Sequence, residues 1–568
     1  MMQNYTHTIS LVGGCLIVLL GLVLHFAAIP EYLSSEIIKA KTLEDDSEAL
    51  ERWISLPMPL EFKVYVFNVT NPNEVSIGAQ PIVKEMGPYV YDEYVSKVNL
   101  KYDADSISYF VRKKFIFNQQ KSGCRREEDV VTSLNVPLLG TAMMVERIFR
   151  PGLPFLNSAI PYLFPGIKNI FWTASVKDLF FDGILLDCTN QNTIAICSAM
   201  DGKTPATLWK LATNDYMFSF FHHKNTSLEG PFVENRGISN ISNLGQISSY
   251  MGKTELSVWL PNSTCNVVKG TDSSIYPPFL TRDHPIYIFQ TDVCASLAAV
   301  YEKEVETEGI KVLRFVNAPE NFGDPYEYES SKCRCKINKK NNTLNCLKPG
   351  VIDLSDCQGA PVISSLPHYL LADSTYKNYV EGLLPNKTEH ATFIDIQPDT
   401  GVPVEGHKRM QLNMHLKKVP GIDVLKYVSE GLFPILWIDE GVKLSGESLE
   451  KLKSFQSSAN LLYWFGMVII ILGVLLSSIA FLYILYAKRM FCFENISSNK
   501  VMSVTDYRTA DQLKAAEVNK TSLFQTSLDP SLNNTLNLKL FPNNHANVYP
   551  NDQQVLQLPH NINSRQSS

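Results

Sequence analysis

The apolar stretch Leu461–Tyr486 constrains the fold of this chain more than any other feature of the sequence. It reads LLYWFGMVIIILGVLLSSIAFLYILY and contains no formal charge. At 1.5 Å per residue, a helix of this length extends about 39 Å, enough to cross a hydrocarbon core of about 30 Å. The basic pair Lys488 and Arg489 follows. Because basic residues favour the cytoplasmic side, the residues before this span are predicted to be extracellular unless another span reverses the direction.

A second apolar stretch, Ile9–Ile29, lies near the other end of the chain. A cleaved signal peptide is the alternative interpretation. Against it, the apolar run is long, no Lys or Arg precedes it, and Phe26 is a poor residue three positions before a cut after Ala28. We therefore expect an uncleaved anchor and both termini in the cytoplasm. The predicted segments are a cytoplasmic N-terminus (1–8), a transmembrane helix (9–29), an extracellular lipid-binding ectodomain (30–460), a transmembrane helix (461–486) and a cytoplasmic, largely disordered tail (487–568).

The composition fits a folded ectodomain between two spans rather than a transporter with many spans. Hydrophobic residues make up 45% of the chain, and the mean hydropathy is −0.05. A segment of this length can bury a large core. The net charge of −6 over 568 residues gives no support for a nucleic-acid partner.

Cysteines and glycosylation motifs both indicate an extracellular segment. Nine of the 11 cysteines lie between the two apolar stretches, and six of those nine fall between positions 265 and 357. An even cluster of this kind is typical of disulfides. A zinc site is the alternative, but the paired CxxC spacing is missing, so no metal is expected. The predicted N-glycosylation sites are Asn68, Asn225, Asn240, Asn262, Asn341 and Asn386.

Short alternating segments after the first span predict β-structure. Residues Glu31–Arg52 are expected to form a polar-faced juxtamembrane helix. From Glu61, the run EFKVYVFNV alternates with a period of two, and Asn71-Pro72 then turns the chain. PIVKEMGPYVYDEYV and SISYFVRKKFIFN continue as short strands. This density of short strands favours an antiparallel, barrel-like sheet.

These segments resemble the class B scavenger receptor family, also called the fatty-acid translocase family. The resemblance lies in EFKVYVFNVTNPNEVSIGAQPIVKEMGPYVY, GTDSSIYPPF, the CRC and DLSDC cysteines, PHYLLAD, EHATFIDIQPDTGVP and KRMQLNM, which follow one another through nearly the whole ectodomain. Two further stretches, DLFFDGILLDC and FPILWIDEGVKL, are most similar to the insect sensory neuron membrane proteins.

The resemblance implies an α+β fold, with an antiparallel β-barrel core, a helical bundle at the membrane-distal apex and a hydrophobic tunnel toward the outer leaflet. Residues 140–171 fit the apex, because they are apolar and prolines 151, 154, 161 and 165 divide them into short helices. Packing of these helices on the barrel is one interpretation. The other is a flexible apolar mouth, with Lys168 and Arg150 receiving a carboxylate. The candidate apolar ligand contacts are Met143, Met144, Phe155 and Phe164.

The family pattern also implies how the cysteines pair. The expected disulfides are Cys265–Cys333, Cys294–Cys357 and Cys335–Cys346, with Cys188–Cys197 suggested by the sensory subgroup. Cys124 is then left unpaired. Cys492, just beyond the second span, is a candidate for palmitoylation, with a free thiol as the alternative.

Catalytic motifs have little support. Asp399-Thr400-Gly401 matches an aspartic-protease signature, but the triplet occurs once, whereas that chemistry needs two carboxylates. His222-His223 lacks the spacing of a zinc helix. We expect no enzyme and no cofactor.

Two functions fit the resemblance. The first is a receptor or co-receptor in the sensory neuron cell membrane, which captures fatty-acid-derived pheromones and passes them toward an odorant receptor channel. The second is general uptake of lipid, lipoprotein or carotenoid; a purely adhesive role is a third.

The two spans carry matching small residues at intervals of seven. They are Gly14, Gly21 and Ala28 in the first span and Gly466, Gly473 and Ala480 in the second. Because small residues let helix backbones approach closely, we expect the two stripes to face each other.

Overall fold

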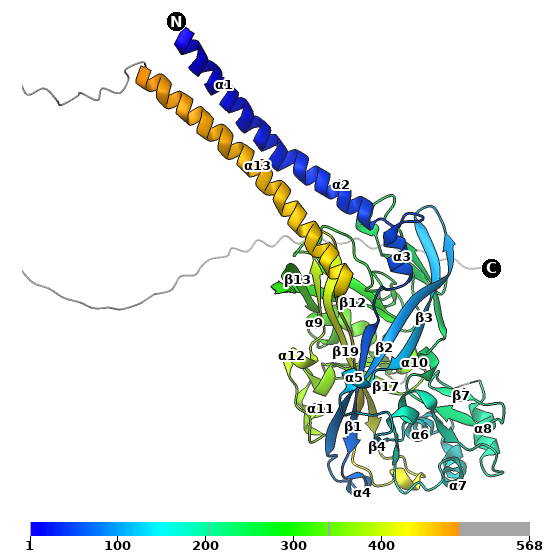
Figure 1. Ribbon diagram of the computed structural model, residues 1–568. Helices are drawn as coiled ribbons and strands as arrows, with labels where there is room; N and C mark the ends of the chain where they lie inside the picture. Colours follow the sequence, from blue (N-terminus) through cyan, green and yellow to red (C-terminus); the bar gives the residue numbers. More distant parts are fainter. Residues whose placement is uncertain (1, 203, 339–340, 488–568) are drawn as a thin grey trace, which may run out of the picture. The chain divides into compact units, whose positions relative to one another are not determined.

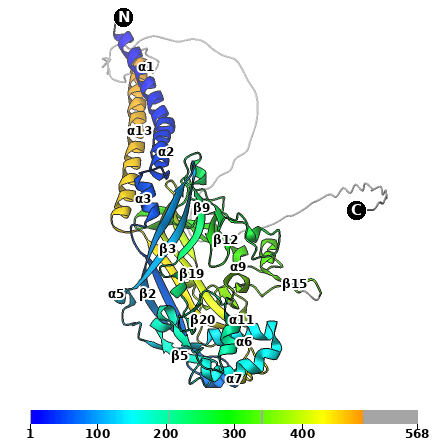
Figure 2. The same cartoon turned by 90° about the vertical axis from the view of Figure 1, so that its right-hand side faces the viewer.

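Two long helices carry the apolar stretches at either end of the ectodomain. The computed structural model describes residues 2–202, 204–338 and 341–487. The helical segments Thr6–Lys41 and Gly446–Ala487 are long and apolar enough to cross a membrane. They lie side by side in Figures 1 and 2 and run antiparallel, since His7 contacts Tyr483 at one end and His25 contacts Tyr463 further along.

The first helical segment consists of three continuous pieces, α1 (Met2–Val23), the π-helix η1 (Leu24–Ala28) and α2 (Ile29–Lys41). The predicted juxtamembrane helix is therefore correct up to Lys41. It is wrong between positions 42 and 47, where the chain leaves the helix before α3 (Glu48–Ile54) begins. Ser47 starts α3 because its side chain accepts a hydrogen bond from the Leu50 N–H at 3.1 Å.

The second helix, α13 (Gly446–Ala487), begins 15 residues before the apolar stretch. Leu449 and Leu452 in this extension are buried with Ile310, Val312 and Val404 of the barrel. The helix is thus packed on the ectodomain before it enters its apolar part.

One antiparallel sheet forms the centre of the ectodomain (Figure 1). Its strand order is β10-β9-β3-β2-β1-β20-β19-β18-β13-β12-β11, and β17 pairs with both β19 and β16. The strands are β1 (Leu60–Val69), β2 (Val83–Tyr102), β3 (Ser106–Phe117), β9 (Leu228–Asn235), β10 (Ile247–Tyr250), β11 (Ile286–Gln290), β12 (Ala295–Thr307), β13 (Ile310–Asn317), β16 (Val351–Asp353), β17 (Val362–Ser365), β18 (Phe393–Gln397), β19 (Val402–Leu416) and β20 (Gly431–Lys443).

Two residues link the outer strands and nearly close the sheet into a barrel. The Ile247 N–H of β10 donates to the Gly270 carbonyl at 2.8 Å, and the Thr271 N–H donates to the Tyr287 carbonyl of β11 at 3.0 Å. Gly270 has φ +89°, and a Cβ there would lie 2.2 Å from the Tyr287 oxygen. Only glycine fits this approach. The predicted antiparallel barrel is confirmed.

Strand β2 is longer than expected. At 20 residues it runs through Gly87-Pro88 and continues to Tyr102, beyond the end of the run PIVKEMGPYVYDEYV. The register with β1 shifts at Gly87-Pro88, between Val64 and Val66. A bulge tolerates a proline that cannot donate to the ladder, so the strand bends there instead of ending.

The predicted apex helices are present as α6 (Val136–Ile148), the 3-10 turn η2 (Arg150–Gly152) and α7 (Leu153–Leu163). Asn135 caps α6 by accepting from the Leu138 N–H at 3.0 Å. Pro161 does not divide the segment as expected, because it lies inside α7 near its end.

The remaining elements connect the strands. They are α4 (Pro72–Ser76), α5 (Gln119–Ser122), β4 (Val130–Leu134), β5 (Phe171–Ser175), η3 (Asp178–Asp182), β6 (Ile184–Leu186), α8 (Ile194–Met200), β7 (Leu208–Lys210), β8 (Tyr216–Phe218), η4 (His222–Lys224), η5 (Ile241–Asn243), η6 (Thr264–Asn266), α9 (Pro319–Phe322), η7 (Glu329–Arg334), β14 (Lys336–Asn338), β15 (Thr343–Asn345), α10 (Ser355–Gln358), η8 (Pro367–Tyr369), α11 (Ser374–Asn378), α12 (Lys387–His390) and η9 (Asp423–Leu425).

Candidate functional site

Three large apolar side chains are exposed on the apex helices. Ile148 and Phe149, at the end of α6, are 70% and 60% exposed, and Phe155 in α7 is 71% exposed. They fall within eight positions of the sequence. Exposed apolar clusters of this kind mark sites that bind proteins, lipids or ligands.

The predicted ligand contacts of the apex divide between surface and core. Phe155 is exposed, whereas Phe164 is 8% exposed and packs its ring against Trp172. Met143 is half-buried against the main core, as core packing of the apex helices predicts. For Phe164 and Met143 the packing interpretation therefore fits better.

The predicted basic residues of the apex lie at the surface. Lys168 and Arg150 are both exposed, and neither makes an ion pair with another described residue. Met144 is half-buried. These side chains are available to a ligand, and their role in binding stays a prediction.

A second candidate site is a cavity inside the barrel wall. Its volume is about 20 Å³, space for about one water. The lining combines apolar and charged side chains. The lining residues are Phe62, Phe115, Met410 and Ile438, with Lys113, Lys224, Asp292, Lys408 and Glu440.

The charged residues around this cavity form a linear array of alternating sign, which we call the barrel ion-pair network. Lys113 of β3 joins two acids, since its Nζ lies 2.7 Å from Glu93 Oε1 and 3.0 Å from Glu440 Oε1. Lys408 of β19 joins the next pair, at 3.0 Å from Glu440 Oε2 and 3.3 Å from Asp292 Oδ2. Lys224 of η4 ends the series on Asp292.

The acids of the network have unequal pKa values. Burial, followed by the charge of Glu440, raises the pKa of Glu93 to about 7 although Lys113 opposes the change. Burial also disfavours ionised Glu440, but Lys113 and Lys408 together lower its pKa well below the usual range. The same holds for Asp292, whose pKa is lowered by Lys224 and Lys408 against the effect of burial. Glu93 is therefore the acid of this network that takes up a proton near neutral pH.

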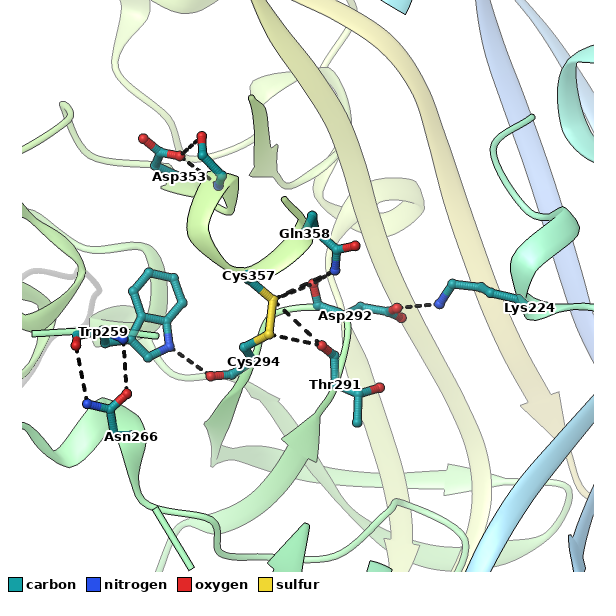
Figure 3. Close-up of a disulfide and its surroundings, with 10 residues drawn as sticks. Lys224, Trp259, Asn266, Thr291, Asp292, Cys294, Asp353, Cys357 and Gln358 are labelled. Atoms are coloured by element: carbon teal, nitrogen blue, oxygen red, sulfur yellow. Dashed lines mark hydrogen bonds and ion pairs between the residues drawn. A yellow bond between two sulfur atoms is a disulfide. The ribbon is translucent and has the colours of Figure 1, made fainter. Parts of the chain in front are cut away.

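A disulfide holds Asp292 at the end of the network (Figure 3). Cys294, two residues further on, is bonded to Cys357. The Gln358 side chain donates to the Asp292 carbonyl at 2.7 Å, and the Trp259 indole donates to the Cys294 carbonyl at 2.7 Å. The loop that presents Asp292 to the two lysines is thus fixed from both sides.

Four disulfides join the pairs that the family resemblance implies. Cys124 is exposed and makes no disulfide with a described residue. Cys492, the palmitoylation candidate, and the tail from 488 to 568 lie outside the described residues. The disulfides are Cys188–Cys197, Cys265–Cys333, Cys294–Cys357 and Cys335–Cys346.

The predicted glycosylation sites differ in exposure. Asn68 and Asn225 are half-buried, and their side-chain oxygens accept hydrogen bonds from the Thr132 and Phe115 N–H groups at 2.8 and 3.2 Å. Occupancy of all six stays a prediction, with the more accessible group the better candidates. The exposed sites are Asn240, Asn262, Asn341 and Asn386.

The protease-like triplet and the paired histidines have ordinary surroundings. Asp399-Thr400-Gly401 forms the turn between β18 and β19, where Asp399 accepts a hydrogen bond from Gln397 at 2.9 Å. His222 stacks on Trp209 at 4.0 Å. Across residues 2–202, 204–338 and 341–487, no group of three or more His, Cys, Asp or Glu side chains is placed to hold a metal.

The small-residue stripes of the two long helices meet, with one correction. Gly14 and Gly21 are buried against α13, and Gly473 is buried against α1. Ala28 is exposed and Ile29 takes its place. The reason is the π-helix, in which the Ile29 N–H donates to the Leu24 carbonyl and one extra residue enters the turn.

The barrel ion-pair network is not among the sites predicted from the sequence. The sequence contains a signal for it, because Lys113 and Phe115 lie two residues apart on β3, as Lys408 and Met410 do on β19. Residues two apart share a face of a strand, so a lysine beside an inward-facing apolar residue indicates a charge inside the barrel. Which acids meet these lysines depends on the sheet order.

Comparisons with known proteins agree on one family. Residues 11–484 match the model of the CD36 family. Sensory neuron membrane protein 2 of Heliothis virescens is 37% identical over 458 residues, which cover 79% of this chain and 88% of the relative. Sensory neuron membrane protein 1 of Apis mellifera is 35% identical over 469 residues, covering 81% and 88%. Sensory neuron membrane protein 2 of Manduca sexta is 33% identical over 479 residues, covering 82% and 92%.

Proposed function

The chain belongs to the CD36 family, and from that premise we propose that it is a membrane receptor or co-receptor for hydrophobic ligands. The ligands are lipid-derived pheromones, and the receptor acts in olfactory detection in sensory neurons. The names of the similar proteins support the sensory part of this proposal.

The observation that carries the ligand part is the exposed apolar cluster at the apex. Ile148, Phe149 and Phe155 present apolar surface to solvent, and removing such surface from water favours binding of an apolar molecule. Lys168 and Arg150 lie in the same segment and attract an acidic head.

The captured ligand passes through the ectodomain toward the outer leaflet and onward to an odorant receptor channel. The barrel cavity has space for about one water, whereas an acyl chain needs many times that volume. Passage through this part of the barrel therefore requires the cavity to widen.

Transfer of a fluorescent fatty acid between vesicles tests the ligand part, with the full chain reconstituted in the acceptor membrane. Phe155→Asp and Phe149→Asp are expected to slow transfer, because a charge at either position disfavours contact with an apolar chain. Tyr326→Asp is the matched control, since Tyr326 is 78% exposed and belongs to the connection between α9 and η7, not to the apex helices. Equal transfer by all variants would contradict the role of the apex.

Expression mapping tests the sensory part. The proposal expects transcript in sensory neurons of olfactory sensilla. Strong expression in gut or fat tissue with none in sensilla would instead support the alternative, a general scavenger receptor for lipid, lipoprotein or carotenoid uptake.

A further inference from the structure

The barrel ion-pair network is more than a set of structural salt bridges. Its three lysines and three acids come from β2, β3, β19, β20, η4 and the β11–β12 connection, which the network ties together across the barrel. Burying charges costs free energy even when they are paired. Five of the six residues of the network also line the cavity.

The two ends of the network differ. At one end, Glu93 is completely buried, and its contact with Lys113 is the one ion pair that it makes within the described residues. Its Oε2 has no hydrogen-bond partner there. At the other end, Lys224 and Lys408 are 26% and 31% exposed and share Asp292. The buried end is short of partners, and the lysine end is partly exposed to solvent.

The cavity itself combines two kinds of surface. Lys113, Lys224 and Lys408 line it together with Asp292 and Glu440. Apolar side chains also line it: Phe62, Phe115, Met410 and Ile438. A site for water alone needs polar partners and no apolar wall. Cations beside apolar groups suit a molecule with an anionic head and an apolar chain.

We propose that the barrel ion-pair network binds the anionic head of the hydrophobic ligand, which pairs with Lys113 and Lys408 once the cavity has widened, while Glu93 takes up a proton from solvent. This inference rests on the proposed function and adds the charge of the ligand and its binding site.

Charge balance explains why binding of the anionic head is accompanied by uptake of a proton at Glu93. Lysines and acids are equal in number, so an anionic head adds one uncompensated negative charge to a buried network. Of the charged groups that face Glu93, Lys113 and Lys408 favour its ionised form and Glu440 disfavours it. Since the pKa of Glu93 is already raised to about 7, Glu93 is the group that is neutralised at least cost. The affinity for an anionic ligand therefore falls as the pH rises through about 7.

Binding of two probes to the full chain in lipid nanodiscs tests this inference. Dodecyl sulfonate keeps its charge at every pH used, and dodecanol is its neutral counterpart; binding to empty nanodiscs is subtracted. The dissociation constant of the sulfonate should rise about tenfold between about pH 6 and pH 8, as uptake of one proton at Glu93 requires. Dodecanol should bind with the same affinity at both pH values.

Three variants locate the effect. Glu93→Gln should bind the sulfonate with an affinity that no longer changes with pH. Lys408→Met should weaken sulfonate binding about tenfold or more and leave dodecanol binding unchanged. Lys303→Met is the matched control, because Lys303 is exposed on β12 and pairs only with Glu302 among the described residues. Thermal unfolding of each variant shows whether it is folded, and Lys113→Met replaces Lys408→Met if that protein is not.

The outcomes separate this inference from the proposed function. If both probes bind and neither the pH nor Lys408→Met distinguishes them, the network is not a ligand site and the proposed function stands. Persistence of the pH effect in Glu93→Gln would likewise overturn the role of Glu93. If neither probe binds the wild-type chain at any pH, the proposed function and this inference fail together.

Discussion

At the scale of single residues, a second buried acid connects the juxtamembrane helix α3 to the barrel. Glu234 of β9 accepts hydrogen bonds from the Trp53 indole at 2.9 Å and from the Tyr109 hydroxyl at 2.6 Å. Nearby, Lys97 pairs with Asp272 at 2.9 Å and lies over the Trp53 ring. Trp53 belongs to α3, so this cluster anchors α3, which follows the first long helix, to the sheet.

Glu234 makes the stability of this anchor depend on pH. Burial and then the charge of Asp272 raise its pKa from 4.5 to about 8. The folded state thus holds the proton more tightly than the unfolded state. This contribution to stability is complete below about pH 4.5 and is lost as the pH rises toward about 8.

Glu234→Gln is expected to remove this dependence, because glutamine resembles the protonated acid. The Tm of the variant should exceed that of the wild type more at about pH 8 than at about pH 5. Thermal unfolding at the two pH values measures the difference, and Glu229→Gln on the same strand is the control. A Tm difference that is the same at both pH values would show that Glu234 is ionised throughout.

At the scale of elements, the disulfides differ in the length of chain that they close. Cys294–Cys357 spans 63 residues and Cys188–Cys197 spans nine. In the chain-entropy model these loops correspond to about 4 and about 3 kcal/mol. Replacing both cysteines by serine should therefore lower the Tm more for the first pair than for the second. An equal loss for both pairs would contradict the entropic account.

The contact between the two long helices depends on glycine. A Cβ at Gly473 would lie 2.7 Å from the Val18 nitrogen and 3.1 Å from the Gly14 oxygen, so the helices would have to separate. The Ser477 hydroxyl lies 3.9 Å from the Cys15 sulfur. A cross-link between these two positions can therefore report how close the two helices are.

Ser477→Cys is expected to form a disulfide with Cys15 under mild oxidation, and Gly473→Leu added to it should prevent the cross-link. Gly13→Leu is the control, since a Cβ at Gly13 has no neighbour within 4 Å. Gly473→Leu should also reduce lipid delivery at unchanged surface expression. Cross-linking that survives Gly473→Leu would show that the stripe does not set the helix spacing.

At the scale of the whole molecule, the antiparallel arrangement of the two long helices brings the start of α1 next to the end of α13. His7 of α1 contacts Tyr483 of α13, with ring centroids 3.8 Å apart. If both helices cross the membrane, residues before α1 and after α13 emerge on the same side. The basic pair Lys488-Arg489 predicts that this side is cytoplasmic.

Epitope tags at the two termini test this topology in intact cells. Antibodies should reach both tags only after the membrane is permeabilised, whereas a tag in the exposed loop at Asn262 should be accessible without permeabilisation. Staining of either terminus in intact cells would contradict the two-span arrangement.

The sequence by itself determined the features that depend on local pattern. Uncharged runs as long as 461–486 favour helices that can span a membrane, and alternating segments such as Glu61–Val69 favour strands. Extended motifs such as those around Gly87 and Cys333 identify the family. The resemblance to that family in turn implied the barrel and the cysteine pairing, and both are found in the structure.

Only the tertiary structure decided which distant residues meet. Glu93 and Lys408 join one network because β1 and β20 bring β2 near β19, and no local pattern contains that order. The π-helix Leu24–Ala28 is a second example. It adds one residue to a helical turn, so that Ile29 and not Ala28 is buried against the other helix, and no local pattern indicates this change. Local preferences specify the elements, whereas the charge balance of the barrel depends on contacts between residues hundreds of positions apart.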